Sequence, residues 1–132
     1  MDEATRAEVG AWLAKAQRDL DSAKRLLTGS PPYRDTAAYH CQQTAEKATK
    51  ALLTASGIEF PKTHDLTALV ALAETGHPGF AQYREAAALL TPFGTSFRYP
   101  GTLSEPDDAE LREALSLAER WLADVIAALR PT

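Results

Sequence analysis

The residues best placed to do chemistry lie on one side of a single predicted helix and in two short segments that follow it. Wound as an α-helix, residues 39–53 separate long polar side chains from a strip of small apolar ones. The polar side contains Gln42, Gln43, Glu46, Lys47 and Lys50. Amides both donate and accept hydrogen bonds, and Glu46 and Lys50 have the spacing of a helical ion pair, so this side is a candidate ligand edge. The alternative interpretation is a water-facing surface that carries one ion pair.

Histidine is the usual proton carrier near neutral pH, and His64 is the candidate in this chain. It lies in Thr63-His64-Asp65, just before a predicted helix. A general base needs an orienting partner and a nucleophile, and the sequence shows neither, so a turn residue that covers the next helix is the competing interpretation. His40 and His77 are isolated, and no pair of histidines has the spacing of a metal site. We therefore predict no metal and no cofactor.

Arg98 is the candidate contact for a phosphate. It follows Phe97 at the end of a helical segment and precedes Tyr99-Pro100-Gly101, which forces a bend. A guanidinium held by rigid surroundings could bind a phosphate through two parallel hydrogen bonds. In the alternative interpretation, Arg98 forms an ion pair with a carboxylate such as Glu46 and packs the bend.

Helical periodicity dominates the chain that must position these residues. Apolar residues recur at helical spacing, and no stretch alternates with period two over the length of a strand. The sequence therefore predicts an all-α fold, an antiparallel helical bundle of about five helices. The predicted helices cover about 4–28, 34–57, a short third segment from Leu66, 79–90 with a bent or restarted turn up to Arg98, and a last helix that begins after Ser104 and ends before Pro131.

The ends of these helices carry recognisable capping residues. Asp35 is expected to cap the second helix, Thr63 or Asp65 the third, and Ser104 the last, with Pro106 near its start. On the first helix, the charged residues outside the apolar stripe, Asp19 among them, are expected to face water.

Length and composition limit the possible classes of protein. The 132 residues suffice for one domain, 1–132, with one core. A net charge of −4 argues against non-specific binding of nucleic acid, although a local basic site remains compatible with it. The lone cysteine, Cys41, lies on the apolar strip and is expected to be a small buried hydrophobic residue. No signal peptide or membrane span is predicted, so we expect a cytoplasmic protein.

Four segments of the chain together resemble the HEPN (higher eukaryotes and prokaryotes nucleotide-binding) domain family. The resemblance extends from Trp12 to about Leu122. The segments that carry it are Trp12 with Ala16-x-x-Asp19-Leu20-x-x-Ala23, Gln42-Gln43-x-x-Glu46-Lys47-x-x-Lys50-Ala51, Thr63-His64-Asp65-Leu66, and Phe97-Arg98-Tyr99-Pro100.

The resemblance implies a stand-alone prokaryotic helical bundle that is commonly a homodimer. Such proteins are often encoded beside a minimal nucleotidyltransferase, and the pair can act as a toxin–antitoxin system. Many members are metal-independent ribonucleases that use an Arg and a His four to six residues later, across a dimer cleft. Arg98 matches the Arg, but no His follows within that distance. Loss of a general acid–base group costs about 10²–10⁴-fold in rate, so nuclease activity is not carried over.

We therefore expect a nucleotide- or RNA-binding module, paired with a minimal nucleotidyltransferase and acting near Arg98. The expected ligand-binding residues are Gln43, Glu46, Lys47, Lys50, His64, Arg98 and Tyr99. One alternative is a degenerate ribonuclease in which Arg98 stabilises phosphate charge and His64 or His40 transfers the proton. The other is a non-catalytic dimerisation or adaptor module in which the glutamine-bearing face simply packs.

Overall fold

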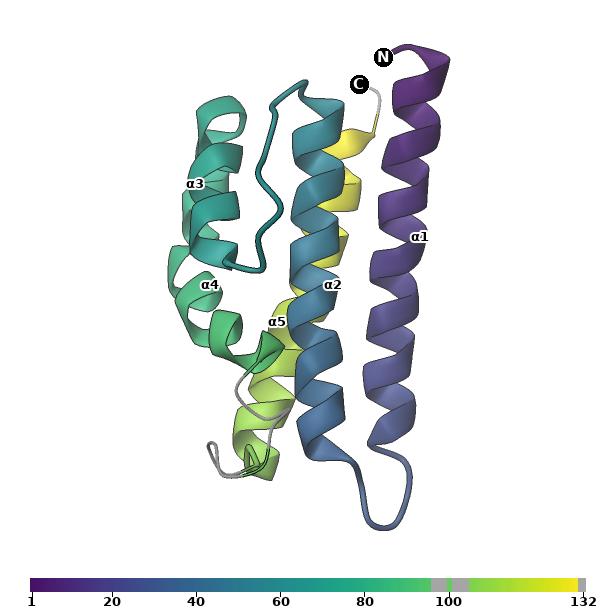
Figure 1. Cartoon of the computed structure of the whole chain (residues 1–132), viewed down its shortest axis with the longest axis vertical. Coiled ribbons are helices and arrows are strands. Elements are labelled where there is room, and N and C mark those ends of the chain that lie inside the picture. Colours follow the sequence, from purple (N-terminus) through teal and green to yellow (C-terminus); the bar gives the residue numbers. More distant parts are fainter. Residues whose placement is uncertain (96–99, 101–104, 131–132) are drawn as a thin grey trace.

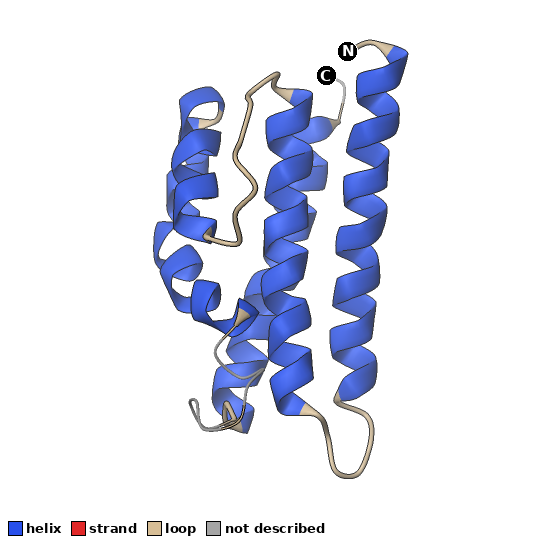
Figure 2. Ribbon diagram, in the orientation of Figure 1, coloured by secondary structure: helices blue, strands red, loops and turns tan. Residues whose placement is uncertain are grey.

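The described residues of the computed structural model, 1–95, 100 and 105–130, form helices and connecting loops (Figures 1 and 2). No strand occurs among them. The α-helices are α1 (Glu3–Leu26), α2 (Arg34–Ala55), α3 (Leu66–Gly76), α4 (Arg84–Leu90) and α5 (Asp108–Leu129). Two 3₁₀ helices, η1 (Pro78–Tyr83) and η2 (Thr91–Gly94), flank α4. The all-α prediction of about five helices is confirmed.

The three long helices, α1, α2 and α5, form one side of the molecule, and α3 and α4 form an antiparallel pair beside α2 (Figure 1). α1 packs antiparallel along α2, where both helices present small residues such as Ala16, Ala23, Ala45 and Ala48, all fully buried. Small side chains let the two helix backbones approach closely, as the sequence predicted.

The connector from residue 56 to 65 runs back along α2, between α2 and α3 (Figure 1). It begins at Gly57, whose φ of 69° lies in the left-handed region that glycine tolerates best. It ends at Asp65, which caps α3 by accepting a hydrogen bond from the backbone N–H of Thr67 at 2.9 Å. This path brings Phe60 and His64 against α2.

Several predicted helix boundaries were wrong in detail. The segment predicted as one helix over 79–90 is a 3₁₀ helix followed by a short α-helix, and Pro92 lies at the start of η2. α5 begins at Asp108 with Asp107 as its N-cap, because Asp107 and Glu110 form a reciprocal capping box; the predicted cap, Ser104, lies outside the described residues. α2 begins at Arg34, as predicted, but its N-cap is Tyr33, which makes no side-chain cap. Asp35 instead accepts from the N–H of its neighbour Thr36.

The centre of the core lies where α2, α5 and η1 meet. Trp121 is fully buried there and donates its ring N–H to Thr49 at 2.9 Å, while the rings of Phe80 and Tyr83 pack against it. Cys41 is buried as predicted, and burial raises the pKa of its thiol to about 12. None of the helices in the described part of the chain is both long and apolar enough to cross a membrane.

Candidate functional site

Five polar residues from α2 and the connector form a hydrogen-bonded network that is buried except at His64, here named the Glu46 cluster: Gln42, Gln43, Glu46, Lys50 and His64. Glu46 is 3% exposed and is the centre of the network. Its Oε1 accepts from the amide of Gln42 at 3.2 Å and lies 2.8 Å from His64 Nδ1, and its Oε2 accepts from Lys50 Nζ at 3.1 Å. Gln43 donates to the Gln42 amide oxygen at 2.7 Å and more weakly to Glu46 at 3.4 Å.

Gln42 ties this network to the chain around it. It is fully buried, and its amide nitrogen donates to the backbone carbonyl of His64 at 3.0 Å. Gly94 in η2 lies directly against the same amide, because a Cβ at that position would be 3.0 Å from Gln42 Cδ and Oε1. The network therefore fixes both the His64 backbone and the backbone of η2 relative to α2.

Lys50 is held between a carboxylate and two aromatic rings. Its Nζ lies 5.5 Å from the centre of the Trp12 ring on α1 and 5.8 Å from that of the Phe60 ring on the connector. Ammonium groups are attracted to the faces of aromatic rings, and the attraction grows when water is excluded. The charge of Lys50 is therefore paired with Glu46 and largely shielded from water.

Glu46 is ionised in this network. Burial by itself raises the pKa of Glu46, but hydrogen bonds from His64 and Gln42 and the charge of Lys50 outweigh it and hold the pKa below the usual value. A carboxylate only accepts hydrogen bonds, so the proton on the facing nitrogen of His64 belongs to Nδ1. In neutral His64, Nε2 is then the free acceptor.

The outer edge of His64 is open to solvent. Its side chain is 70% exposed although its partner Glu46 is buried. A carboxylate that orients an imidazole through Nδ1 while Nε2 faces outward is an arrangement suited to proton transfer or to contact with a phosphate. The interpretation of His64 as only a turn residue overlooked this buried partner.

A second cluster lies between α1 and α2, here named the Asp19 cluster: Asp19, His40 and Lys47. His40 Nδ1 lies 2.8 Å from one carboxylate oxygen of Asp19, and Lys47 Nζ lies 2.6 Å from the other. The prediction that Asp19 faces water was wrong, because it sits among buried Ala16, Leu20 and Ala23 on the packed side of α1.

The structure gathers four of the predicted ligand-binding residues, namely Gln43, Glu46, Lys50 and His64. Lys47 joins Asp19 instead. Arg98 and Tyr99 lie outside the described residues, so their role stays a prediction. The alternative of a water-facing surface on α2 was wrong, because Gln42, Gln43, Glu46 and Lys50 are all buried. The connector and η2 cover this side, and helix periodicity alone does not predict such a cover.

Sequence reasoning missed the aromatic pair around Lys50, the partners of Asp19 and the contact of Gly94. Only Asp19 carried a signal, because three and four residues separate it from Ala16 and Ala23 on one helix face. Within the described part of the chain, no group of three His, Cys, Asp or Glu side chains could hold a metal ion.

The class of protein to which this helical arrangement belongs is identified by comparison of the sequence with known protein families. The model of the HEPN domain matches residues 9–126, and the chain belongs to this family.

Two solved structures are similar over most of their length. One is ST0689, described as an archaeal HEPN homologue, with 30% identity and a TM-score of 0.73. The other is TT1696 from Thermus thermophilus, with 29% identity and a TM-score of 0.76. Each comparison covers 92% of this chain and 98% of the other. None of the curated proteins gives a significant match.

Proposed function

We propose that this HEPN protein is a nucleotide- or RNA-binding module whose ligand contacts the exposed edge of His64. One observation carries the proposal: a buried, ionised Glu46 orients a histidine that is itself 70% exposed. Burying a charged network costs desolvation free energy that ion pairing rarely exceeds, so stability alone is a weak reason for it. A network that aims an imidazole at solvent has a functional reason, because such groups cluster at binding and catalytic sites.

Arg98 and Tyr99 complete the proposed site. The sequence places Arg98 four residues after Gly94, whose backbone lies against Gln42. A guanidinium binds phosphate in a fixed two-pronged geometry, and a protonated His64 would add a further donor. The ligand class is therefore a nucleotide or a short single-stranded RNA.

Binding of ATP and of a short fluorescent RNA by the purified protein tests this proposal. We expect His64→Ala and Arg98→Ala each to weaken binding about tenfold, which is the scale of a lost charge-assisted hydrogen bond. The matched control is His77→Ala, because His77 bonds Ser56 at the far end of α3 and lies outside the Glu46 cluster. Equal binding by all variants would refute the site. A melting temperature lowered by several degrees in Arg98→Ala, with binding intact, would make Arg98 structural.

The assembly belongs to the same proposal: a homodimer that works with a minimal nucleotidyltransferase, as in toxin–antitoxin pairs. Its support is membership of the family and the resemblance of the motifs. Light scattering tests the dimer, and co-purification with a small nucleotidyltransferase encoded beside the gene tests the pairing. A monomer that gains no melting temperature from any nucleotide well above millimolar concentration would favour the adaptor alternative.

A second candidate, a metal-independent ribonuclease, is favoured by the 2.8 Å contact between His64 and Glu46. In this reaction His64 Nε2 would take the proton of a ribose 2′-hydroxyl, whose oxygen attacks the adjacent phosphate and releases the 5′-oxygen with a proton from solvent. Cleavage measured in a chelator should fall by about 10²–10⁴-fold in His64→Ala. His77→Ala is the control, because His77 bonds Ser56 and belongs to neither cluster. Equal activity in wild type, His64→Ala and Arg98→Ala would identify a contaminating nuclease.

A further inference from the structure

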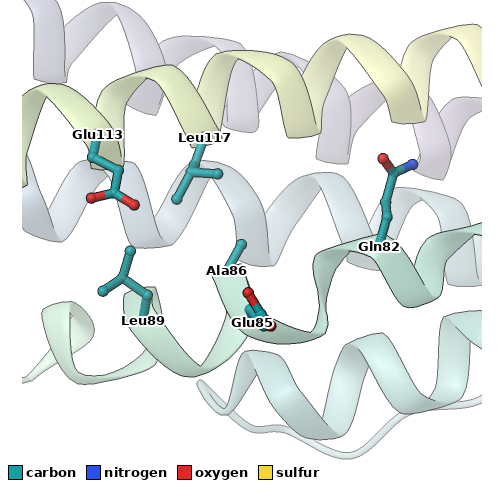
Figure 3. A pocket seen from close by; sticks show the side chains of 6 residues that line it. All are labelled: Gln82, Glu85, Ala86, Leu89, Glu113 and Leu117. Atoms are coloured by element: carbon teal, nitrogen blue, oxygen red, sulfur yellow. The ribbon is translucent and has the colours of Figure 1, made fainter.

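A groove of about 320 Å³ lies between α4 and α5 (Figure 3), and no residue of the Glu46 cluster lines it. Its lining residues are Gln82, Glu85, Ala86, Leu89, Glu113 and Leu117. Gln82 belongs to η1, and Glu85, Ala86 and Leu89 belong to one side of α4. Glu113 and Leu117 have the spacing i, i+4 on α5, so their side chains share one face of that helix. Leu89 points from α4 toward α5, while Glu113 and Leu117 point back toward α4 (Figure 3).

The floor of the groove is apolar and partly exposed. Leu89 is 41% exposed, whereas the other exposed large hydrophobic residues in the described part of the chain, Met1 and Tyr33, lie outside the helices. Ala86 beside it is small, so it leaves room for another backbone to approach. A helix laid parallel to α4 and α5 would cover Leu89 and Leu117 together.

The edges of the groove carry negative charge that no described residue neutralises through an ion pair. Glu85 and Glu113 are exposed, and neither forms an ion pair within the described residues. The cations next to them in sequence are directed elsewhere. Arg84 binds Glu74, and Arg112 donates to the backbone carbonyl of Asp108 at 3.4 Å.

These charges also argue against a second copy of the chain as the occupant. Two copies that met groove to groove around a twofold axis would bring the same carboxylates face to face. Like charges opposed across an interface cost several kcal/mol. The complement of an apolar floor with acidic edges is an apolar stripe flanked by lysine or arginine.

We infer that the α4–α5 groove docks a basic amphipathic helix of a partner protein, with an apolar side chain against Leu89 and Leu117 and cations beside Glu85 and Glu113. This surface shares no lining residue with the Glu46 cluster, and the inference does not depend on the nucleotide site proposed above.

A fluorescent helical peptide of about 20 residues, with leucines along one stripe and lysines beside it, is the probe. Wild-type protein is expected to bind it with a Kd on the order of micromolar and more weakly at high salt. Glu85→Lys with Glu113→Lys should weaken binding about tenfold or more, and so should Leu89→Asn. Glu3→Lys with Glu8→Lys on α1 is the matched control, an equal charge change at two exposed glutamates outside the groove.

Three results of the peptide-binding experiment would overturn the inference. They are no binding of the peptide to wild type, equal binding by the double lysine variant, or equal binding of a peptide whose lysines are replaced by glutamate. Self-association of the wild type that Leu89→Asn abolishes would also overturn it, because the groove would then belong to a contact between copies. If Leu89→Asn fails to fold, the double lysine variant still decides, because both of its positions are exposed.

Discussion

The Glu46 cluster and the Asp19 cluster contain the same three groups, a carboxylate, a histidine bonded through Nδ1 and a lysine, yet they differ in what they expose. In both, the carboxylate lies 2.8 Å from the histidine. In the Asp19 cluster, His40 and Lys47 come from α2 and are 24% and 22% exposed, and Asp19 comes from α1. In the Glu46 cluster, His64 is 70% exposed.

This difference in exposure separates a cluster that only joins two helices from a cluster that also exposes its histidine side chain to solvent. The Asp19 cluster joins α1 and α2, because Asp19 on α1 contacts both His40 and Lys47 on α2. The Glu46 cluster adds two buried glutamines and places its histidine on the connector, outside the helix pair. The same three groups therefore join α1 to α2 in the Asp19 cluster and orient an imidazole toward solvent in the Glu46 cluster.

Replacing the two carboxylates should break the two clusters unequally. Glu46→Ala should lower the free energy of unfolding by about 3–5 kcal/mol, because it leaves the Lys50 ammonium buried without its carboxylate and removes one acceptor from each of two buried glutamine amides. Asp19→Ala should cost only about 1–3 kcal/mol, because His40 and Lys47 both reach water. Urea unfolding monitored by circular dichroism measures both. A loss in Glu46→Ala no larger than that in Asp19→Ala would show that the two clusters are energetically alike.

Gly94 offers a second test of how tightly the Glu46 cluster is held. Gly94→Ala should destabilise the protein by about 1–3 kcal/mol, because its Cβ would press on the Gln42 amide, which is buried and bonded on both sides. Gly10→Ala is the matched control. A Cβ at Gly10, which is exposed on α1, would meet no neighbouring atom within 4 Å. This substitution should therefore stabilise the helix by about 0.5–1 kcal/mol. Equal effects of the two substitutions would mean that Gln42 moves aside freely.

Acid should weaken the Glu46 cluster selectively. The pKa of folded Glu46 is below its ordinary value of 4.5, so the folded state binds fewer protons there than the unfolded state. The stabilisation is therefore complete above about pH 4.5 and is lost as the pH falls through the folded value. The free energy of unfolding of wild type and of Glu46→Gln, measured between about pH 6 and pH 2.5, tests this loss of stabilisation. The difference in free energy of unfolding between the two proteins should shrink toward low pH. A constant difference would contradict the ionised state of Glu46.

The sequence was sufficient for the fold and for part of the site. Apolar periodicity predicted the helices, and the small residues of α2 predicted its close packing, because both depend on local spacing. The burial of Glu46 was not predictable in this way, because it depends on where the connector and η2 lie. His64 is 18 residues from Glu46, and only the tertiary path of the connector joins them.

The smallest expected difference in stability between the clusters concerns their histidines, His64 and His40. His64→Ala should change the free energy of unfolding by less than about 0.5 kcal/mol, because the ring is largely exposed and Glu46 keeps its bonds from Gln42 and Lys50. His40→Ala should cost about 1 kcal/mol, because it removes one of the two groups that pair with Asp19 and a ring contact with Tyr39. Ligand binding should show the opposite order. A His64 variant that loses stability but keeps full binding would assign this imidazole to the scaffold, and the contrast between the two clusters would then rest on burial alone.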